Sequence, residues 1–76
     1  MKYYIQYLDV SPISGKIYEP CGDRAIIILD GRLNLDSMIN AAHENNGARR
    51  PQYAHFKIMR GNRFNNNNKV IYSTIN

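Results

Sequence analysis

Acidic residues are missing from a large part of this chain. No aspartate or glutamate occurs in residues 48–76, whereas six lysines and arginines do. Residues 1–47 carry four cations and six acids, so the net charge is −2 in the first part, +6 in the second and +4 overall. An even mixture of charges would indicate ordinary solubilising surface. The one-sided distribution instead predicts a positive face and an anionic partner.

Cysteine and long apolar runs are also scarce. The single cysteine excludes an intramolecular disulfide framework and favours a reducing, cytoplasmic compartment. The longest apolar run, residues 25–29, falls far short of the roughly 18 residues of a membrane span. The first ten residues lack the apolar core of a signal peptide. We therefore expect no membrane partner.

Residue types that hold metals or catalyse reactions are few. Cys21, His43 and His55 lack the paired short spacings of a zinc site, and the glycines form no phosphate-binding loop. A chain of 76 residues also leaves little volume for a deep active site. We expect a single domain over residues 1–76, with no metal, no cofactor and no enzymatic activity.

Aromatic and β-branched residues predict several strands. The expected strands are 2–10, 17–19, 24–29 and 69–75. Both faces of 2–10 are apolar, which is typical of a central strand, and the alternative is that Tyr4 is exposed. The run at 24–29 shows no alternation, which indicates a strand covered on both faces.

One helix is predicted between these strands. Asn34 is a suitable N-cap for a helix from residue 35 to about residue 46. The apolar residues Leu35, Met38, Ile39 and Ala42 follow the spacing of one helix face. The sequence Asn45-Asn46-Gly47 predicts a left-handed C-cap.

Residues 52–60 fit two structures. Ala54, Phe56 and Ile58 alternate with polar or larger residues, which favours a strand with these three side chains facing inward. Tyr53, Phe56 and Arg60 would instead share one face of a helix that begins at Pro51. We favour the strand, and the alternative stays open.

The predicted connection after this strand is short. Gly61-Asn62 suits a tight hairpin, and Asn65 to Asn68 suit a flexible loop. The predicted fold class is α+β, with a small antiparallel or mixed sheet of four to five strands packed against the helix.

The segment 48–69 is the candidate binding surface. Cations neutralise phosphates, and aromatic rings stack on bases. The candidate residues for a nucleic acid or another partner are Arg49, Arg50, Tyr53, Lys57, Arg60, Arg63 and Lys69. The structural alternative is a solvated charged face whose rings belong to the core. If Ala54, Phe56 and Ile58 face inward, the set of candidate binding residues is reduced to the cations at 49–50 and at 60–69.

A run of residues also resembles a known family. The run ILDGRLNLDSMINAA at 28–42, followed by Arg50-Pro51 and Phe56, is similar to the start of KilA-N domains, which are DNA-binding modules of phages and large viruses. In that family a strand ending in Asp-Gly precedes a helix with a Leu-Asn-Asp-Leu-like start, and a basic-Pro-x-x-Phe-like segment follows. The resemblance covers residues 24–58. It implies a phage or prophage accessory protein acting in the cytoplasm of a bacterial host.

Three functions are compatible with these observations. The first is a non-enzymatic accessory protein that binds DNA or RNA through its basic part. The second is a phage-encoded inhibitor of a host defence or nucleic-acid-processing complex, bound through the basic face or through exposed tyrosines. The third is a ribonuclease toxin with His55 as the base. A sheet with an open edge can also pair with a second copy, so a homodimer is a further expectation.

Overall fold

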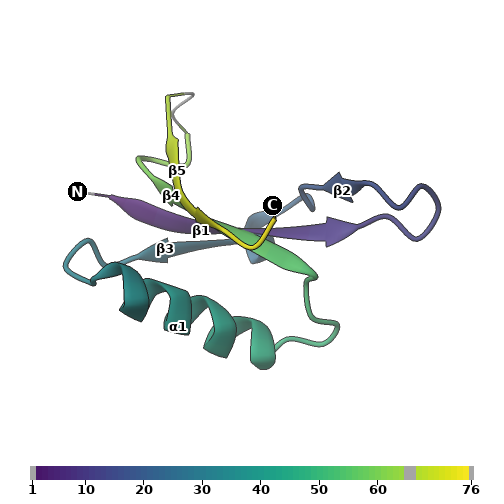
Figure 1. Cartoon of the computed structure of the whole chain (residues 1–76), viewed down its shortest axis with the longest axis horizontal. Helices are drawn as coiled ribbons and strands as arrows, with labels where there is room; N and C mark the ends of the chain where they lie inside the picture. The colour runs from purple at the N-terminus through teal and green to yellow at the C-terminus, as the bar shows by residue number, and fades with distance from the viewer. Residues whose placement is uncertain (1, 65–66, 76) are drawn as a thin grey trace.

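One helix packs against one face of an antiparallel sheet of five strands (Figure 1). The computed structural model describes residues 2–64 and 67–75. The elements are β1 (Tyr3–Val10), β2 (Ile17–Tyr18), a 3-10 turn (Asp23–Ala25), β3 (Ile26–Leu29), α1 (Leu35–Gly47), β4 (His55–Arg60) and β5 (Lys69–Ser73). The predicted α+β class is therefore confirmed, and the sheet is antiparallel rather than mixed.

Strand β1 is the centre of the sheet, as its two apolar faces predicted. It pairs along one side with β4, from Tyr3 opposite Arg60 to Leu8 opposite His55. On its other side it pairs first with β3 and then, beyond Gln6, with the short β2. β5 adds to the outer side of β4. The β1–β2 hairpin extends away from the helix as an arm (Figure 1).

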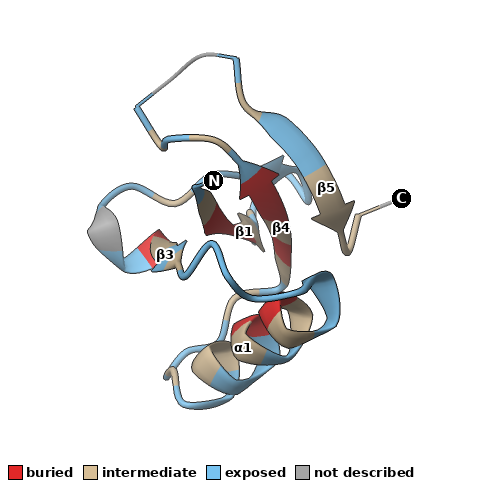
Figure 2. Ribbon diagram, turned by 90° about the vertical axis from the view of Figure 1, so that its left-hand side faces the viewer, coloured by how far each residue is buried: buried red, intermediate tan, exposed pale blue. Residues whose placement is uncertain are grey.

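The core lies between the sheet and α1. Residues directly opposite each other on paired strands share a face, so Ile5 and Tyr7 of β1 lie beside Ile58 and Phe56 of β4. All four are buried, and they pack with Met38 and Ala42 of α1. Figure 2 shows the buried residues on β1, on β4 and on the side of α1 that faces them.

Helix α1 has the predicted start and a different end. The Asn34 side chain accepts a hydrogen bond from the Ser37 N–H at 2.8 Å, which confirms the N-cap. The prediction of a left-handed C-cap is wrong, because the helix continues through Gly47 and Ala48 has a φ of −84°. The Arg50 guanidinium donates to the Gly47 carbonyl at 2.9 Å, so the last turn has a partner without a left-handed residue.

Strand β4 confirms the strand interpretation of residues 52–60, but it begins later than predicted. Two hydrogen bonds join the Asn46 amide to the backbone N–H and carbonyl of Tyr53, each at 2.9 Å. They hold Tyr53 against the end of α1 and keep it out of the ladder. Ala54 is exposed, so its predicted inward position is wrong, whereas Phe56 and Ile58 are buried as expected.

The connection from β4 to β5 is longer than the predicted tight hairpin. It extends from Gly61 to Asn68, and the predicted loop residues 65–66 lie outside the described residues. The Asn68 amide donates to the Tyr4 hydroxyl at 2.8 Å and to the Asn62 carbonyl at 2.7 Å. These contacts fold the connection back over the sheet, and the register shifts beyond Ile58. β5 then ends at Ser73, two residues earlier than expected.

Candidate binding surface

Five of the six cations of segment 48–69 lie at opposite ends of β4, and the sixth, Lys57, lies within the strand. Arg49 and Arg50 precede the strand, whereas Arg60, Arg63 and Lys69 lie at or beyond its end. A strand of six residues is about 20 Å long at about 3.3 Å per residue. The segment therefore does not present its charges as one patch.

Arg49 packs on the edge of the core. Its guanidinium lies 5.0 Å from the centre of the Tyr7 ring and 5.2 Å from that of Tyr53, and these two rings stack at 5.3 Å. With its oxygen turned towards Arg49, the Asn45 amide accepts two hydrogen bonds, at 3.1 Å and 3.3 Å. Arg49 and Tyr53 thus have structural partners at the positions where the sequence predicted binding residues.

Arg50 and Lys57 also contact the protein itself. Arg50 donates to the carbonyls of Gly47 and Arg49 at the end of α1. Lys57 forms an ion pair with Glu19 at 3.2 Å, and its side chain is 26% exposed. The charge of Lys57 is therefore balanced by an acid from the first half of the chain.

Lys2, Arg60 and Lys69 lie at the other end of the sheet, and Arg63 follows in the β4–β5 connection. Arg60 is opposite Lys69 on β5 and opposite Tyr3 on β1, while the Gly61 N–H donates to the Lys2 carbonyl at 2.8 Å. Lys2, Arg60 and Lys69 are exposed, and Arg63 is half-buried with its guanidinium 4.8 Å from the Phe64 ring. We call Lys2, Arg60, Arg63 and Lys69 the sheet-end cation cluster.

Lys2 was missed by sequence reasoning because it lies far from the basic segment in the chain. Its place follows from the antiparallel register of β1 and β4, which only the structure provides. Asp30, which follows β3, forms an ion pair with Arg32 at 2.8 Å. Hydrogen bonds from Arg32 lower the pKa of Asp30, so this carboxylate is ionised and paired at neutral pH.

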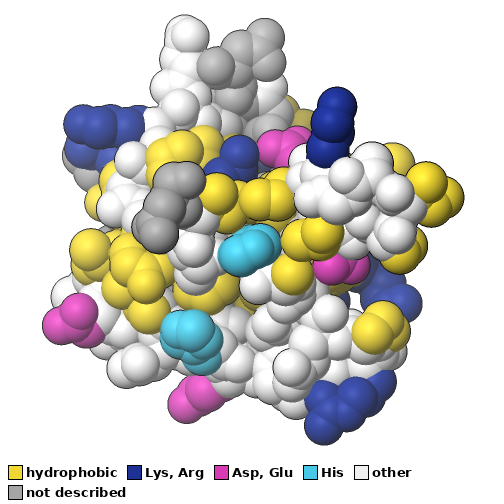
Figure 3. All heavy atoms as spheres, turned by 45° about the vertical axis from the view of Figure 1, so that its right-hand side comes forward, with side chains coloured by type: hydrophobic (Ala, Val, Ile, Leu, Met, Phe, Trp, Pro, Cys, Tyr) yellow, Lys and Arg dark blue, Asp and Glu magenta, His cyan; other side chains and the backbone are white. Residues whose placement is uncertain are grey.

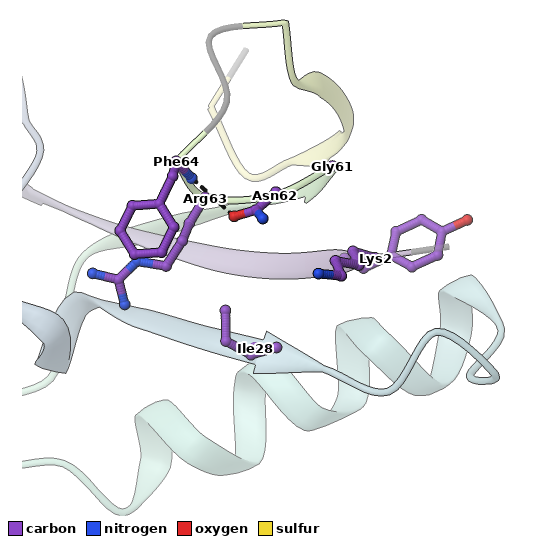
Figure 4. Close-up of a pocket in the computed structure, with 7 residues that line it drawn as sticks. Lys2, Ile28, Gly61, Asn62, Arg63 and Phe64 are labelled. Atoms are coloured by element: carbon purple, nitrogen blue, oxygen red, sulfur yellow. Dashed lines mark hydrogen bonds between the residues drawn. The ribbon is translucent and has the colours of Figure 1, made fainter.

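A cavity of about 410 Å³ opens beside the sheet-end cation cluster (Figure 4). It is lined by Lys2, Tyr3, Ile28, Gly61, Asn62, Arg63 and Phe64. The Ile28 side chain is exposed, which corrects the prediction that strand 24–29 is covered on both faces. The reason is that α1 covers one face of the sheet, and the β4–β5 connection covers only part of the other.

The histidines lie apart from this cluster. His55 is at the start of β4, and its Nδ1 is 3.2 Å from the Thr74 hydroxyl. His43 on α1 is exposed and meets the Phe56 ring edge-on at 5.2 Å. Figure 3 shows histidine side chains near the middle of one face, with the larger groups of Lys and Arg at its edges. Among residues 2–64 and 67–75, no group of three His, Cys, Asp or Glu side chains could hold a metal ion.

Most of the tyrosines belong to the core. Tyr4 and Tyr7 are buried, and Tyr3, Tyr53 and Tyr72 pack against the core cluster. Tyr18 on the arm is 46% exposed. The tyrosines therefore do not gather into one exposed surface.

No protein-family model, curated protein or solved structure matches this chain. The resemblance of residues 24–58 to KilA-N domains, and the phage origin that it implies, stay predictions. Within the described ranges, no helix has the length and apolar composition needed to cross a membrane.

Proposed function

We propose that this protein binds nucleic acid through the sheet-end cation cluster. The observation that carries the proposal is the register, which brings Lys2, Arg60 and Lys69 from the ends of three strands to one edge of the molecule beside Arg63. Several cations at one edge match the repeated charges of a phosphate backbone. Such contacts position a protein on a nucleic acid and contribute little sequence specificity.

The proposal assigns binding to the sheet-end cation cluster and not to the whole basic segment 48–69. Arg49 and Arg50 lie at the other end of β4, and Lys57 is paired with Glu19, so we expect these three to contribute little to binding. Lys2, which lies outside that segment, contributes instead.

Fluorescence anisotropy with labelled oligonucleotides tests the proposal. Four phosphate contacts predict that the logarithm of the affinity falls with the logarithm of salt concentration with a slope of about −3, between about 50 mM and about 200 mM salt. Charge reversal of Arg60→Glu with Lys69→Glu is expected to lower affinity at least about tenfold and to make the slope shallower. The matched control is Lys16→Glu with Arg24→Glu, which changes the net charge equally at exposed positions away from the cluster.

Two results would contradict the proposal. The first is no detectable binding of single-stranded or duplex DNA or RNA at about 50 mM salt, where phosphate contacts are strong. The second is an equal loss of affinity in both double variants, because that would assign binding to net charge rather than to the cluster.

A second candidate function, binding to a host protein, is favoured by the β1–β2 arm. Val10, Ile13, Ile17 and Tyr18 on this arm are all exposed, and Ile13 is 96% exposed. Apolar side chains gathered on a projecting hairpin are typical of a protein contact. A nuclease-resistant complex with one host protein that is lost in Ile13→Ser would support this function.

A further inference from the structure

We infer that the cavity beside the sheet-end cation cluster accepts one unpaired nucleobase, so that the protein prefers single-stranded to duplex nucleic acid. This inference rests on the proposed function and specifies the form of nucleic acid that the surface recognises. It is carried by the walls of the cavity, the way Phe64 is held and the charges beside it.

The walls are two apolar side chains that the core does not use. Ile28 of β3 is 62% exposed and Phe64 of the β4–β5 connection is 81% exposed, and they lie on different sides of the cavity (Figure 4). The volume of about 410 Å³ is within the range of about 300 to 1,000 Å³ found for ligand sites. An aromatic ring exposed to this degree beside a cavity is suited to stacking on a flat ligand.

Hydrogen bonds hold the turn that carries Phe64. Its N–H donates to the Asn62 side-chain oxygen at 3.1 Å, and the Asn62 carbonyl accepts from the Asn68 amide. The Gly61 N–H is bonded to the Lys2 carbonyl, so the start of the turn is fixed to β1. The Arg63 guanidinium lies 4.8 Å from the Phe64 ring centre and gives the ring a charged neighbour. The backbone that carries Phe64 is therefore held in place beside the cavity before any ligand arrives.

The apolar walls and the neighbouring cations together favour a ligand that has a flat face and negative charges beside it. A nucleobase offers a flat face to Phe64, and the phosphates on either side of it would lie near Lys2 and Arg63, which line the cavity. In a duplex, neighbouring base pairs cover both faces of each base, so Phe64 has no face to contact. An unpaired base has no such obstacle, and it joins stacking to the phosphate contacts of the cluster.

The test compares a labelled single strand of about 12 nucleotides with the duplex of the same sequence, in the range of sites that single-strand-binding domains cover. We expect the wild-type protein to bind the single strand at least about tenfold more tightly. Phe64→Ala should lower single-strand affinity about tenfold, the typical effect of removing one stacking ring, and leave duplex affinity nearly unchanged. Phe64→Tyr should retain the preference, because it retains the ring. Leu35→Ala on α1 is the matched control for loss of an exposed apolar side chain, because Leu35 is 42% exposed and does not line the cavity.

Thermal melting separates this effect from unfolding, because the exposed Phe64 should tolerate alanine without a change in midpoint. Equal wild-type affinity for single strand and duplex, or an equal loss of both in Phe64→Ala, would overturn the inference and leave the proposed function intact. Absence of binding to both the single strand and the duplex would overturn the inference and the proposed function together. Phe64-dependent binding of a polyglutamate peptide without single-strand preference would assign the cavity to acidic peptides and overturn the inference too.

Discussion

Tyr7 is the side chain that joins the two layers of the molecule. It is fully buried on β1, and its hydroxyl donates to the Ala42 carbonyl of α1 at 2.7 Å. Its ring stacks on Tyr53 and meets Phe56 edge-on at 6.2 Å. A buried hydroxyl needs such a partner, because an unpaired polar group inside a protein lowers its stability.

Replacing Tyr7 with phenylalanine should therefore destabilise the fold. We expect Tyr7→Phe to reduce the free energy of unfolding by about 1–2 kcal/mol, since a buried hydrogen bond is lost while the ring remains. Urea denaturation followed by circular dichroism measures this change. Tyr18→Phe is the control, because Tyr18 is 46% exposed on the arm and its change should stay within about 0.5 kcal/mol. Equal effects of the two substitutions would show that the hydroxyl of Tyr7 has no special role.

Arg49 shows the limit of prediction for single residues. Its charge is visible in the sequence, but its contact with the rings of Tyr7 and Tyr53 depends on how α1 lies on the sheet. We expect Arg49→Ala to lower the free energy of unfolding by about 1 kcal/mol, a typical value for a cation over aromatic rings. Nucleic-acid affinity should stay within about twofold of the wild type, measured under conditions where both proteins are folded. A large loss of affinity with unchanged stability would instead make Arg49 a binding residue.

At the level of elements, the β4–β5 connection depends on Gly61. This glycine has a φ of +131°, where residues with a side chain are strained, and an added Cβ would lie 2.9 Å from Cγ of Asn68. Gly47, in contrast, is in the last turn of α1, and a Cβ added there would meet nothing within 4 Å beyond its neighbours and its own helix backbone. The same substitution to alanine can therefore be compared at a strained position, Gly61, and at an open helical position, Gly47.

Gly61→Ala should destabilise the protein by about 1–3 kcal/mol, because it combines backbone strain with a steric contact. Gly47→Ala should stabilise it by up to about 1 kcal/mol, because alanine is the better helix residue. Both values come from chemical denaturation of the two variants beside the wild type. A stabilised Gly61→Ala variant would contradict the observed conformation of the connection.

The sequence predicted elements well where local interactions define them. The cap at Asn34 and the spacing of Met38 and Ala42 placed α1 to within one residue of its observed end. The connection after Arg60 was predicted poorly, because Gly61-Asn62 indicates a turn but not its length. That length depends on Asn68 bonding to Tyr4, a residue on the distant first strand.

At the level of the whole molecule, stability should vary strongly between the sheet and the arm. β1 and β4 pair along six residues over the buried core, whereas β2 has two residues and both are exposed. Amide protons of Ile5, Tyr7 and Ile58 should exchange with solvent only on global unfolding, and that of Tyr18 by local opening of the arm. Native-state hydrogen exchange measures both. Similar protection in β1 and β2 would contradict this ranking.

The charge division of the sequence was predictable, but its distribution in space was not. Composition alone separates an acidic first part from a basic second part. Folding places Glu19 against Lys57 and adds Lys2 to the cations at the end of β4. Charged residues from the two parts of the sequence therefore lie beside each other in space. A binding surface built from strand ends requires knowledge of the register, which hydrophobic patterns along one chain do not contain.

The central position of β1 also bears on the order in which the chain folds. β1 is the first strand in the sequence, yet its longest partner, β4, follows after the helix, so most of the sheet depends on contacts between distant parts of the chain. Such topologies fold more slowly than those with local contacts, in the range of about milliseconds to seconds for small domains. During synthesis on the ribosome, Ile5 and Tyr7 therefore stay without their β4 partners until residues 55–60 have emerged. The core between β1, β4 and α1 can therefore form only after residues 55–60 are available.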